Sequence, residues 1–386
     1  MPSVVGSIPT GHILTSDFEV TTWNKGNPFD QRNKAVCLAW KENNGHAWCD
    51  FVDNAPPEWN DYNDVNLFVF FNAKFDLHWY RKCGVDVSSW KIWCCQLAEF
   101  LLSGQTERYP SLENTAIKYG LGHKLDVIKL EYWDKGINTD EIPRDILSEY
   151  AKQDVELTYA IYLKQLEQFQ ANSLLFKLFK LQCQDLLVLE EMEWNGLVFD
   201  EQKCLDTADV LDKEIEQIKE GLSKVYPDVP INFNSGDQLS AFLFGGVVKE
   251  ETKEHIGFYK TGDKAGQPKY KNVIKEHVLP RLVEPGKSTK KDGVFKTDEA
   301  TLRKLKGKAA KTFVGPLLRL AELDKLNSTY YRGLVNKRIE MNWPKGEIHG
   351  QFNQVVAGTG RLSSSSPNLQ NFSGECLDIF VSRYDS

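Results

Sequence analysis

The sequence has 386 residues, of which 41% are hydrophobic, 26% charged and 12% aromatic, with a formal net charge of −7. This composition excludes a disordered, fibrous or small disulfide-stapled chain, and the length favours two or three domains. No apolar run approaches the roughly 18 residues of a membrane span, and the N-terminal MPSVVGSIPTGH lacks the features of a signal peptide. We therefore expect a cytoplasmic protein without a membrane partner.

The first 170 residues predict strands followed by helices. Runs of β-branched, aromatic or continuous apolar residues predict strands at 13–22, 34–40, 46–52 and 67–71. Helical periodicity with capping residues predicts helices at 74–82, 111–119 and 143–170. This order, with a hairpin between the second and third strands, predicts an α/β fold in which helices flank a mixed sheet.

The rest of the chain predicts mainly helices. Two of these helices cover 176–194 and 201–225. A third begins at a capping box formed by Ser235 and Gln238 and runs through Phe244. Residues 245–296 are rich in Gly, Pro and Lys and predict an exposed hairpin or loop. Helices resume at Thr297 and continue, with a break near Pro316, to about Met341. Two long helices separated by a lysine-rich tip predict a projecting arm.

Charge is distributed unevenly along the chain. Residues 1–170 hold 16 basic and 24 acidic residues, whereas residues 251–320 hold 17 basic and 8 acidic residues. An acidic first part and a basic later segment favour a carboxylate-rich catalytic site beside a phosphate-binding arm. The alternative for the basic segment is an ordinary solvated loop.

Five residues of the first part carry candidate catalytic chemistry. Asp17 and Glu19 are two apart on a predicted strand, so both carboxylates point to one face. Asp76 comes shortly after the buried strand at 67–71, where α/β sheets collect functional groups. Tyr150 and Asp154 are four apart on a predicted helix and share a face. Each feature alone is more often structural: an exposed edge pair, a first-turn helix acid or a chance spacing.

Three motifs follow one another along the chain: Asp-x-Glu on a strand, Asn72-Ala-Lys-Phe-Asp76 after a strand, and Tyr-x-x-x-Asp on a helix. Together they resemble the three exonuclease motifs of the DEDD superfamily. The tyrosine subtype proofreads in family A DNA polymerases, and the second motif is closest to the bacteriophage branch. The resemblance implies an RNase H-like α/β exonuclease domain that hydrolyses DNA from the 3′ end with two Mg²⁺ or Mn²⁺ ions. The all-oxygen ligand set suits such hard cations.

The resemblance also implies a role for each residue. Asp17 would bridge both metal ions, and Glu19 and Asp154 would complete the site that binds the attacking water. Asp76 would act on the second metal ion, through water, and Tyr150 would orient the nucleophile by a hydrogen bond.

A second resemblance lies near the C-terminus. TGRLSS at 359–364, followed by PNLQN at 367–371, resembles the stretch that opens the palm of family A polymerases, although composition alone would predict a loop. The segment at 192–196, the segment at 325–330, His349 and Gln354 also fall in the family's order. The resemblance implies an exonuclease domain at 1–172, a mainly helical thumb with a basic tip at 173–345 and an incomplete palm at 346–386.

This second resemblance implies contacts with primer-template DNA, in addition to single-stranded 3′ ends in the exonuclease site. Phosphate contacts by lysines at the thumb tip would give salt-sensitive affinity without sequence preference. The DNA-binding candidates are Arg361, Asn368 and Gln370 in the palm stretch and Lys287, Lys290, Lys291, Lys304, Lys306 and Lys308 in the thumb.

The acids after Asn371 are Glu375, Asp378 and Asp385, and none stands in the family's later palm motifs. We therefore expect exonuclease activity but no DNA synthesis from this chain alone. A polypeptide carrying the remaining palm and the fingers is the expected partner if the gene is split; a truncated sequence is the alternative. The location would be the host cytoplasm if the source is a bacteriophage. Two other functions stay open: a stand-alone DEDD exonuclease, and a non-catalytic DNA-binding subunit that completes a split polymerase.

Overall fold

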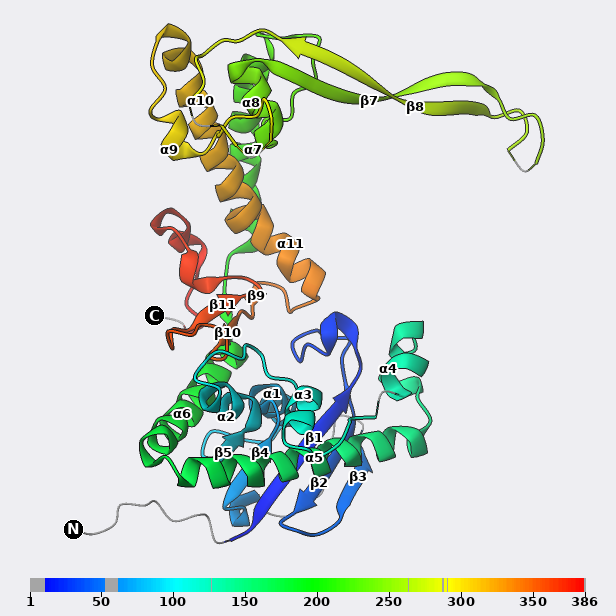
Figure 1. Ribbon diagram of the computed structural model, residues 1–386, viewed down its shortest axis with the longest axis vertical. Coiled ribbons are helices and arrows are strands. Elements are labelled where there is room, and N and C mark those ends of the chain that lie inside the picture. Colours follow the sequence, from blue (N-terminus) through cyan, green and yellow to red (C-terminus); the bar gives the residue numbers. More distant parts are fainter. Residues whose placement is uncertain are drawn as a thin grey trace. The chain divides into compact units, whose positions relative to one another are not determined.

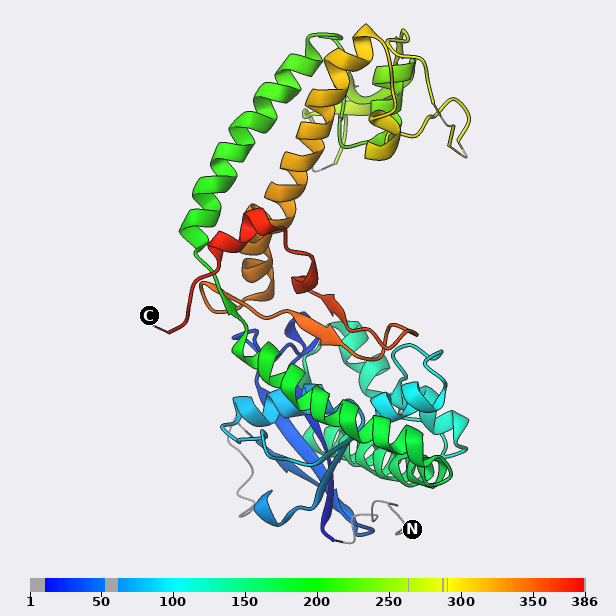
Figure 2. The same ribbon diagram turned by 90° about the vertical axis from the view of Figure 1, so that its left-hand side faces the viewer.

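The computed structural model describes residues 11–52, 62–125, 127–262, 264–286, 288–289 and 291–384. It divides into two compact units (Figures 1 and 2). The first comprises residues 1–201 and 336–386, and the second comprises residues 202–335. Among the helices of the described residues, none is both long enough and apolar enough to cross a membrane.

The first unit is built on a five-stranded sheet in the order β3-β2-β1-β4-β5. The central strand β1 pairs antiparallel with β2 and parallel with β4, β2 pairs antiparallel with β3, and β4 pairs parallel with β5. The mixed α/β sheet predicted from the sequence is therefore present. Its strands are β1 (Ile13–Val20), β2 (Ala35–Glu42), β3 (Ala47–Phe51), β4 (Leu67–Phe70) and β5 (Ile92–Cys94).

Helices cover both faces of this sheet. The long helix α5 runs across one face and contacts all five strands (Figure 1), including β5, where Gln165 accepts a hydrogen bond from the Trp93 side chain at 3.1 Å. On the other face, Phe18 of β1 packs edge-on against Tyr80 of α1, and Ser16 hydrogen-bonds the Tyr80 hydroxyl at 2.9 Å. The helices of this part are α1 (Ala73–Lys82), α2 (Cys95–Leu102), α3 (Leu112–Lys118), α4 (Val127–Glu131) and α5 (Arg144–Gln170).

Helix α6 (Ser173–Asn195) belongs to the sheet unit rather than to the second unit. Its Phe179 packs against Trp93 and Phe169 in the sheet's core, with ring centroids 4.5 and 4.9 Å apart. Residues from 336 onward return to the same unit. The domain borders after residues 172 and 345, which the resemblance implies, do not coincide with the borders between the compact units, because α6 and the residues from 336 onward pack with the sheet.

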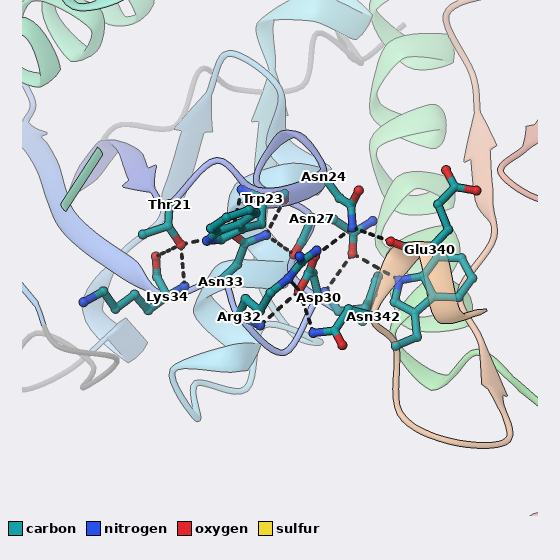
Figure 3. Close-up of polar contacts among 12 residues, drawn as sticks. Thr21, Trp23, Asn24, Asn27, Asp30, Arg32, Asn33, Lys34, Glu340 and Asn342 are labelled. Carbon is teal, nitrogen blue, oxygen red and sulfur yellow. Dashed lines mark hydrogen bonds and ion pairs between the residues drawn. The ribbon is translucent and has the colours of Figure 1, made fainter. Parts of the chain in front are cut away.

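The loop between β1 and β2 joins this returning segment through a polar network (Figure 3). Buried Asp30 accepts hydrogen bonds from Arg32, from Asn24 at 2.7 Å and from Asn342 at 3.0 Å. Burial alone would raise the pKa of Asp30, but these donors outweigh it and lower the pKa to about 2. The carboxylate is therefore charged at neutral pH and ties the loop to the segment that follows α11.

Short strands complete the first unit. They form two antiparallel pairs, one between β6 and β9 and the other between β10 and β11. Their bounds are β6 (Leu197–Val198), β9 (Glu347–Ile348), β10 (Gln351–Asn353) and β11 (Ser363–Ser365). The TGRLSS stretch therefore enters a strand at its serines rather than forming only a loop.

The second unit is mainly helical and contains one long hairpin. Its core includes Phe242, Leu243 and Phe244 of α8 and Leu320 and Leu323 of α10. Of the predicted alternatives for 245–296, an exposed hairpin or a loop, the structure has a hairpin, and it occupies the first part of this range, from Gly246 to Leu279. The elements of the second unit are α7 (Glu201–Ser223), α8 (Gly236–Phe244), β7 (Gly246–Phe258), β8 (Pro268–Leu279), α9 (Glu299–Leu302), α10 (Lys308–Lys325) and the start of α11 (Arg332–Met341).

Two local expectations in this unit were wrong in detail. Pro316 lies inside α10 without ending it, because Leu317, Leu320 and Leu323 continue the buried stripe; the helical irregularity is instead a π-helical turn at Leu326–Tyr331. Ser235 accepts from the Gln238 amide, but the Gln238 side chain accepts from Asn232 and does not close the capping box.

Candidate active site

The central strand presents two carboxylates to the face that α5 covers. Asp17 and Glu19 lie opposite Ala39 and Cys37 of β2, and these two β2 residues pack in a cluster with Tyr150 of α5. The intervening Phe18 enters the core on the opposite face. The period of two along a strand therefore places both acids on one face, as the sequence predicted, and the structure adds that α5 covers this face.

Helix α5 supplies the third carboxylate of a compact group. Asp17, Glu19 and Asp154 each offer a carboxylate oxygen, and these oxygens lie within 4.8 Å of one another. Glu19 and Asp154 are buried. Among the residues that the structure describes, Asp154 Oδ1 has no hydrogen-bond partner. Buried, mutually close acceptors that lack donors are the arrangement that a divalent cation satisfies.

Asp76 reaches the same region from the first turn of α1. Its Oδ1 accepts a hydrogen bond from the Phe18 amide at 3.0 Å, which ties α1 to β1 beside Asp17. It lies outside the group of three close oxygens but lines the same cavity, of about 380 Å³. Tyr150 lines this cavity too, with its ring edge-on to Trp133. All five candidate catalytic residues thus surround one cavity.

Lys124 is a further member of the site that sequence reasoning missed. Its ammonium forms an ion pair with Asp154 Oδ2 and lies 4.6 Å from the centroid of the Tyr150 ring. It comes from the irregular segment between α3 and α4. Its sequence context, Gly-His-Lys-Leu, has no feature of a site; the one available signal was that several clustered acids need a counter-charge.

Burial and mutual repulsion raise the pKa values of these carboxylates. Burial raises the pKa of Asp17 to about 6 and that of Asp154 to about 7, although Lys124 acts in the opposite direction on both. Burial, followed by repulsion from Asp17, holds the pKa of Glu19 and of Asp76 well above the usual range. The pKa of Lys124 is raised, because attraction from the acids exceeds the effect of its burial. A bound cation would favour the charged carboxylates in the same way.

The candidate DNA-binding residues of the palm stretch are all exposed. Arg361 precedes β11, and Asn368 and Gln370 follow it. The Asn368 side chain accepts from the Gln370 amide at 3.0 Å and so caps a short 3-10 turn. Part of this asparagine's function is therefore local structure.

In the second unit, Lys304, Lys306 and Lys308 are exposed and close together between α9 and the first residue of α10. Lys291 is also exposed and forms an ion pair with Asp237 at 2.5 Å. Lys287 and Lys290 lie outside the described residues. The structure therefore presents an exposed cluster of three lysines and one lysine that is already paired.

Comparisons with known proteins agree with this arrangement. Residues 23–169 match the family model described as 3′-5′ exonuclease, and residues 265–379 match the model described as DNA polymerase family A. The first match includes Asp76, Tyr150 and Asp154 but begins after Asp17 and Glu19.

Several bacterial proteins are similar in sequence. DNA polymerase I of Synechocystis is 29% identical over 322 residues, which are 80% of this chain and 27% of that protein. DNA polymerase I of Bacillus subtilis is 26% identical over 81% of this chain and 30% of its own length. Thermostable DNA polymerase I of Thermus filiformis is 32% identical over 48% of this chain and 17% of its own length. The chain spans less than a third of these relatives.

A solved structure shares the fold. The polymerase domain of Pol1 from M. smegmatis, in complex with DNA primer-template and dNTP, superposes with a TM-score of 0.67 at 19% identity. The match covers 96% of this chain and 55% of that chain. With both family models matched in order along its length, the chain is similar to the 3′-5′ exonuclease and polymerase parts of the family A DNA polymerases.

Proposed function

We propose that this chain removes nucleotides from the 3′ end of DNA by hydrolysing the terminal phosphodiester bond, as a proofreading exonuclease does. The observation that carries the proposal is the group of Asp17, Glu19 and Asp154 oxygens within 4.8 Å of one another, in the cavity that Asp76 and Tyr150 also line. In the reaction, a water oxygen forms a bond to phosphorus and the bond from phosphorus to the 3′ oxygen breaks. The product is a 5′-mononucleotide.

The residues present fit two divalent cations, either Mg²⁺ or Mn²⁺. Asp17 would bridge them, Glu19 and Asp154 would complete one site, and Asp76 would serve the other. Two such ions supply a nucleophilic water at neutral pH and neutralise charge on the attacking and leaving oxygens. The orphaned Asp154 Oδ1 and the raised pKa values of the cluster support this ligand set.

The chain's own residues then position the reactants. The hydrogen bond from the Phe18 amide fixes Asp76 relative to β1. It thereby holds the distance between the carboxylate of Asp76 on α1 and those of Asp17 and Glu19 on β1. Trp133 and Lys124 border the Tyr150 ring, which limits where its hydroxyl can point. From there, the hydroxyl would orient the attacking water by a hydrogen bond.

We further propose that residues 265–379 contribute to binding of primer-template DNA. The exposed Lys304, Lys306 and Lys308 would contact phosphates, and exposed Arg361 would make a positioning contact that reads little sequence. The match of this segment to the polymerase family model supports the proposal.

The exonuclease proposal is tested with purified protein, single-stranded DNA labelled at its 5′ end and Mg²⁺. Wild-type protein should shorten the labelled strand stepwise, and Asp17→Ala should abolish shortening. Asp134→Asn, which removes an exposed charge outside the cluster, should leave the rate unchanged. Undiminished activity of Asp17→Ala would contradict the assignment. A parallel reaction with primer-template and dNTPs tests extension; extension only after a polypeptide with the remaining palm and fingers is added supports the expected partner.

A further inference from the structure

The segment that carries Lys124 is held on both sides by side chains of neighbouring helices. The Lys124 amide donates to Glu113 Oε2 of α3 at 2.5 Å, and the Leu125 amide donates to Gln153 Oε1 of α5 at 2.7 Å. The Gln153 amide nitrogen in turn donates to the His123 carbonyl at 3.3 Å. Three hydrogen bonds over three consecutive residues fix the backbone from which the lysine extends.

From this anchored backbone, Lys124 extends into the cavity. Its side chain is 25% exposed, whereas that of its partner Asp154 is 2% exposed. The Lys124 side chain is therefore more open to solvent than the Asp154 carboxylate, and both line the cavity into which a phosphodiester would enter. A lysine whose only function was to neutralise a buried acid would not need this access.

The ion pair occupies a carboxylate oxygen that the proposed function assigns to a cation. Asp154 Oδ2 cannot bind the ammonium and a divalent cation at the same time without weakening one of the two interactions, because the two positive charges repel each other. When a cation takes the oxygen, the ammonium stays tethered by its braced segment within the same cavity. A phosphate of the substrate that enters this cavity is then an anion that the ammonium can contact.

We propose that Lys124 is a catalytic residue of the hydrolysis, an inference that rests on the proposed function. Without a cation, its ammonium neutralises the group formed by Asp17, Glu19 and Asp154. With substrate bound, it contacts a non-bridging oxygen of the scissile phosphate and stabilises the negative charge that develops during attack by water. A fixed cation at such a position acts only where charge accumulates, which favours the transition state over the ground state.

The experiment compares Lys124→Met with Lys124→Arg, which keeps the charge. Lys129→Met, an exposed lysine of the nearby helix α4, is the matched control. Two quantities are measured: Mn²⁺ affinity without DNA, by electron paramagnetic resonance, and the single-turnover rate of 3′ hydrolysis at saturating Mn²⁺. Tryptophan fluorescence checks folding, and Lys124→Gln replaces Lys124→Met if the latter does not fold.

The two readouts should move in opposite directions for Lys124→Met. Mn²⁺ should bind roughly tenfold more tightly, because a competing positive charge is gone, while hydrolysis should slow ~100-fold, as for loss of one charge-stabilising group. Lys124→Arg should recover most of the rate, and Lys129→Met should match wild type in both.

An unchanged single-turnover rate in Lys124→Met would overturn the proposal, as would a rate loss explained entirely by weaker Mn²⁺ binding. Wild-type protein that binds Mn²⁺ and hydrolyses no DNA would instead refute the proposed function. The two failures are therefore distinguishable.

Discussion

Replacing Asp154 by asparagine should stabilise the metal-free protein while it abolishes hydrolysis. Asp154 is buried, one of its oxygens has no partner among the described residues, and burial raises its pKa from 3.8 to about 7. The folded protein thus holds the Asp154 proton more tightly than the unfolded chain does. Stability must therefore fall as pH rises from about 4 through about 7.

The magnitude follows from the two pKa values. At a pH above both, their difference corresponds to a destabilisation of about 4 kcal/mol that arises from the ionised Asp154. Asparagine resembles the protonated acid and removes this cost. The pKa of about 7 already includes the attraction of Lys124 to the ionised carboxylate, so we expect a gain of up to about 4 kcal/mol at pH 8. At pH 5 the folded carboxyl is already protonated, and the gain should be smaller.

Urea unfolding in EDTA, followed by tryptophan fluorescence, measures this effect. All ten tryptophans belong to the unit that contains the sheet, so their signal reports on that unit alone. Asp154→Asn should unfold at a higher urea concentration than wild type at pH 8, and by a smaller margin at pH 5. Asp134→Asn removes one exposed charge and should match wild type at both values.

An equal or lower stability of Asp154→Asn at pH 8 would refute the reasoning. It would mean that the ion pair with Lys124 contributes more to the fold than burial of the carboxylate costs. A gain of the same size at both pH values would also contradict it, since the cost should be present only where the carboxylate is ionised.

Three further outcomes are expected. Mn²⁺ affinity should rise between pH 5.5 and 8, with protons released on binding in calorimetry, because protons compete for carboxylates of raised pKa; a flat profile argues against these ligands. Replacing Lys304, Lys306 and Lys308 together by glutamine should lower the slope of log affinity for primer-template against log salt by roughly one for each phosphate that these lysines neutralise; an unchanged slope excludes them. Asp30→Asn should lower the urea midpoint at pH 7 and by roughly a third as much at pH 2.5, since the contribution of this carboxylate is present above its ordinary pKa of 3.8 and is lost as pH falls through its folded pKa of about 2; equal decreases at both values would show that charge is unimportant there.

The carboxylate site was predictable because its residues follow local periodicities. Asp17 and Glu19 share a strand face at a period of two, and Tyr150 and Asp154 share a helix face at a spacing of four. Four of the five strands of the mixed sheet followed for a similar reason, since each has its own β-branched, aromatic or apolar run; the short strand β5 was not predicted. These patterns identify the elements and their inward faces without knowledge of the partner element.

Lys124 was not predictable, because its position depends on the side chains of Glu113 and Gln153, which brace an irregular segment without any period of its own. The association of α6 with the sheet core has a similar origin, since Phe179 would satisfy a helical pattern in either unit.

By itself, therefore, the sequence determined most of the long elements of this protein, the shared faces of its acidic side chains and its resemblance to family A polymerases, but not β5, α2 or α4. The tertiary structure alone decided that β1 and α5 bring three carboxylate oxygens within 4.8 Å and that a lysine ammonium pairs with one of those acids. The physical reason is that periodicity is local to one element, whereas distances between charges on different elements depend on how the chain packs.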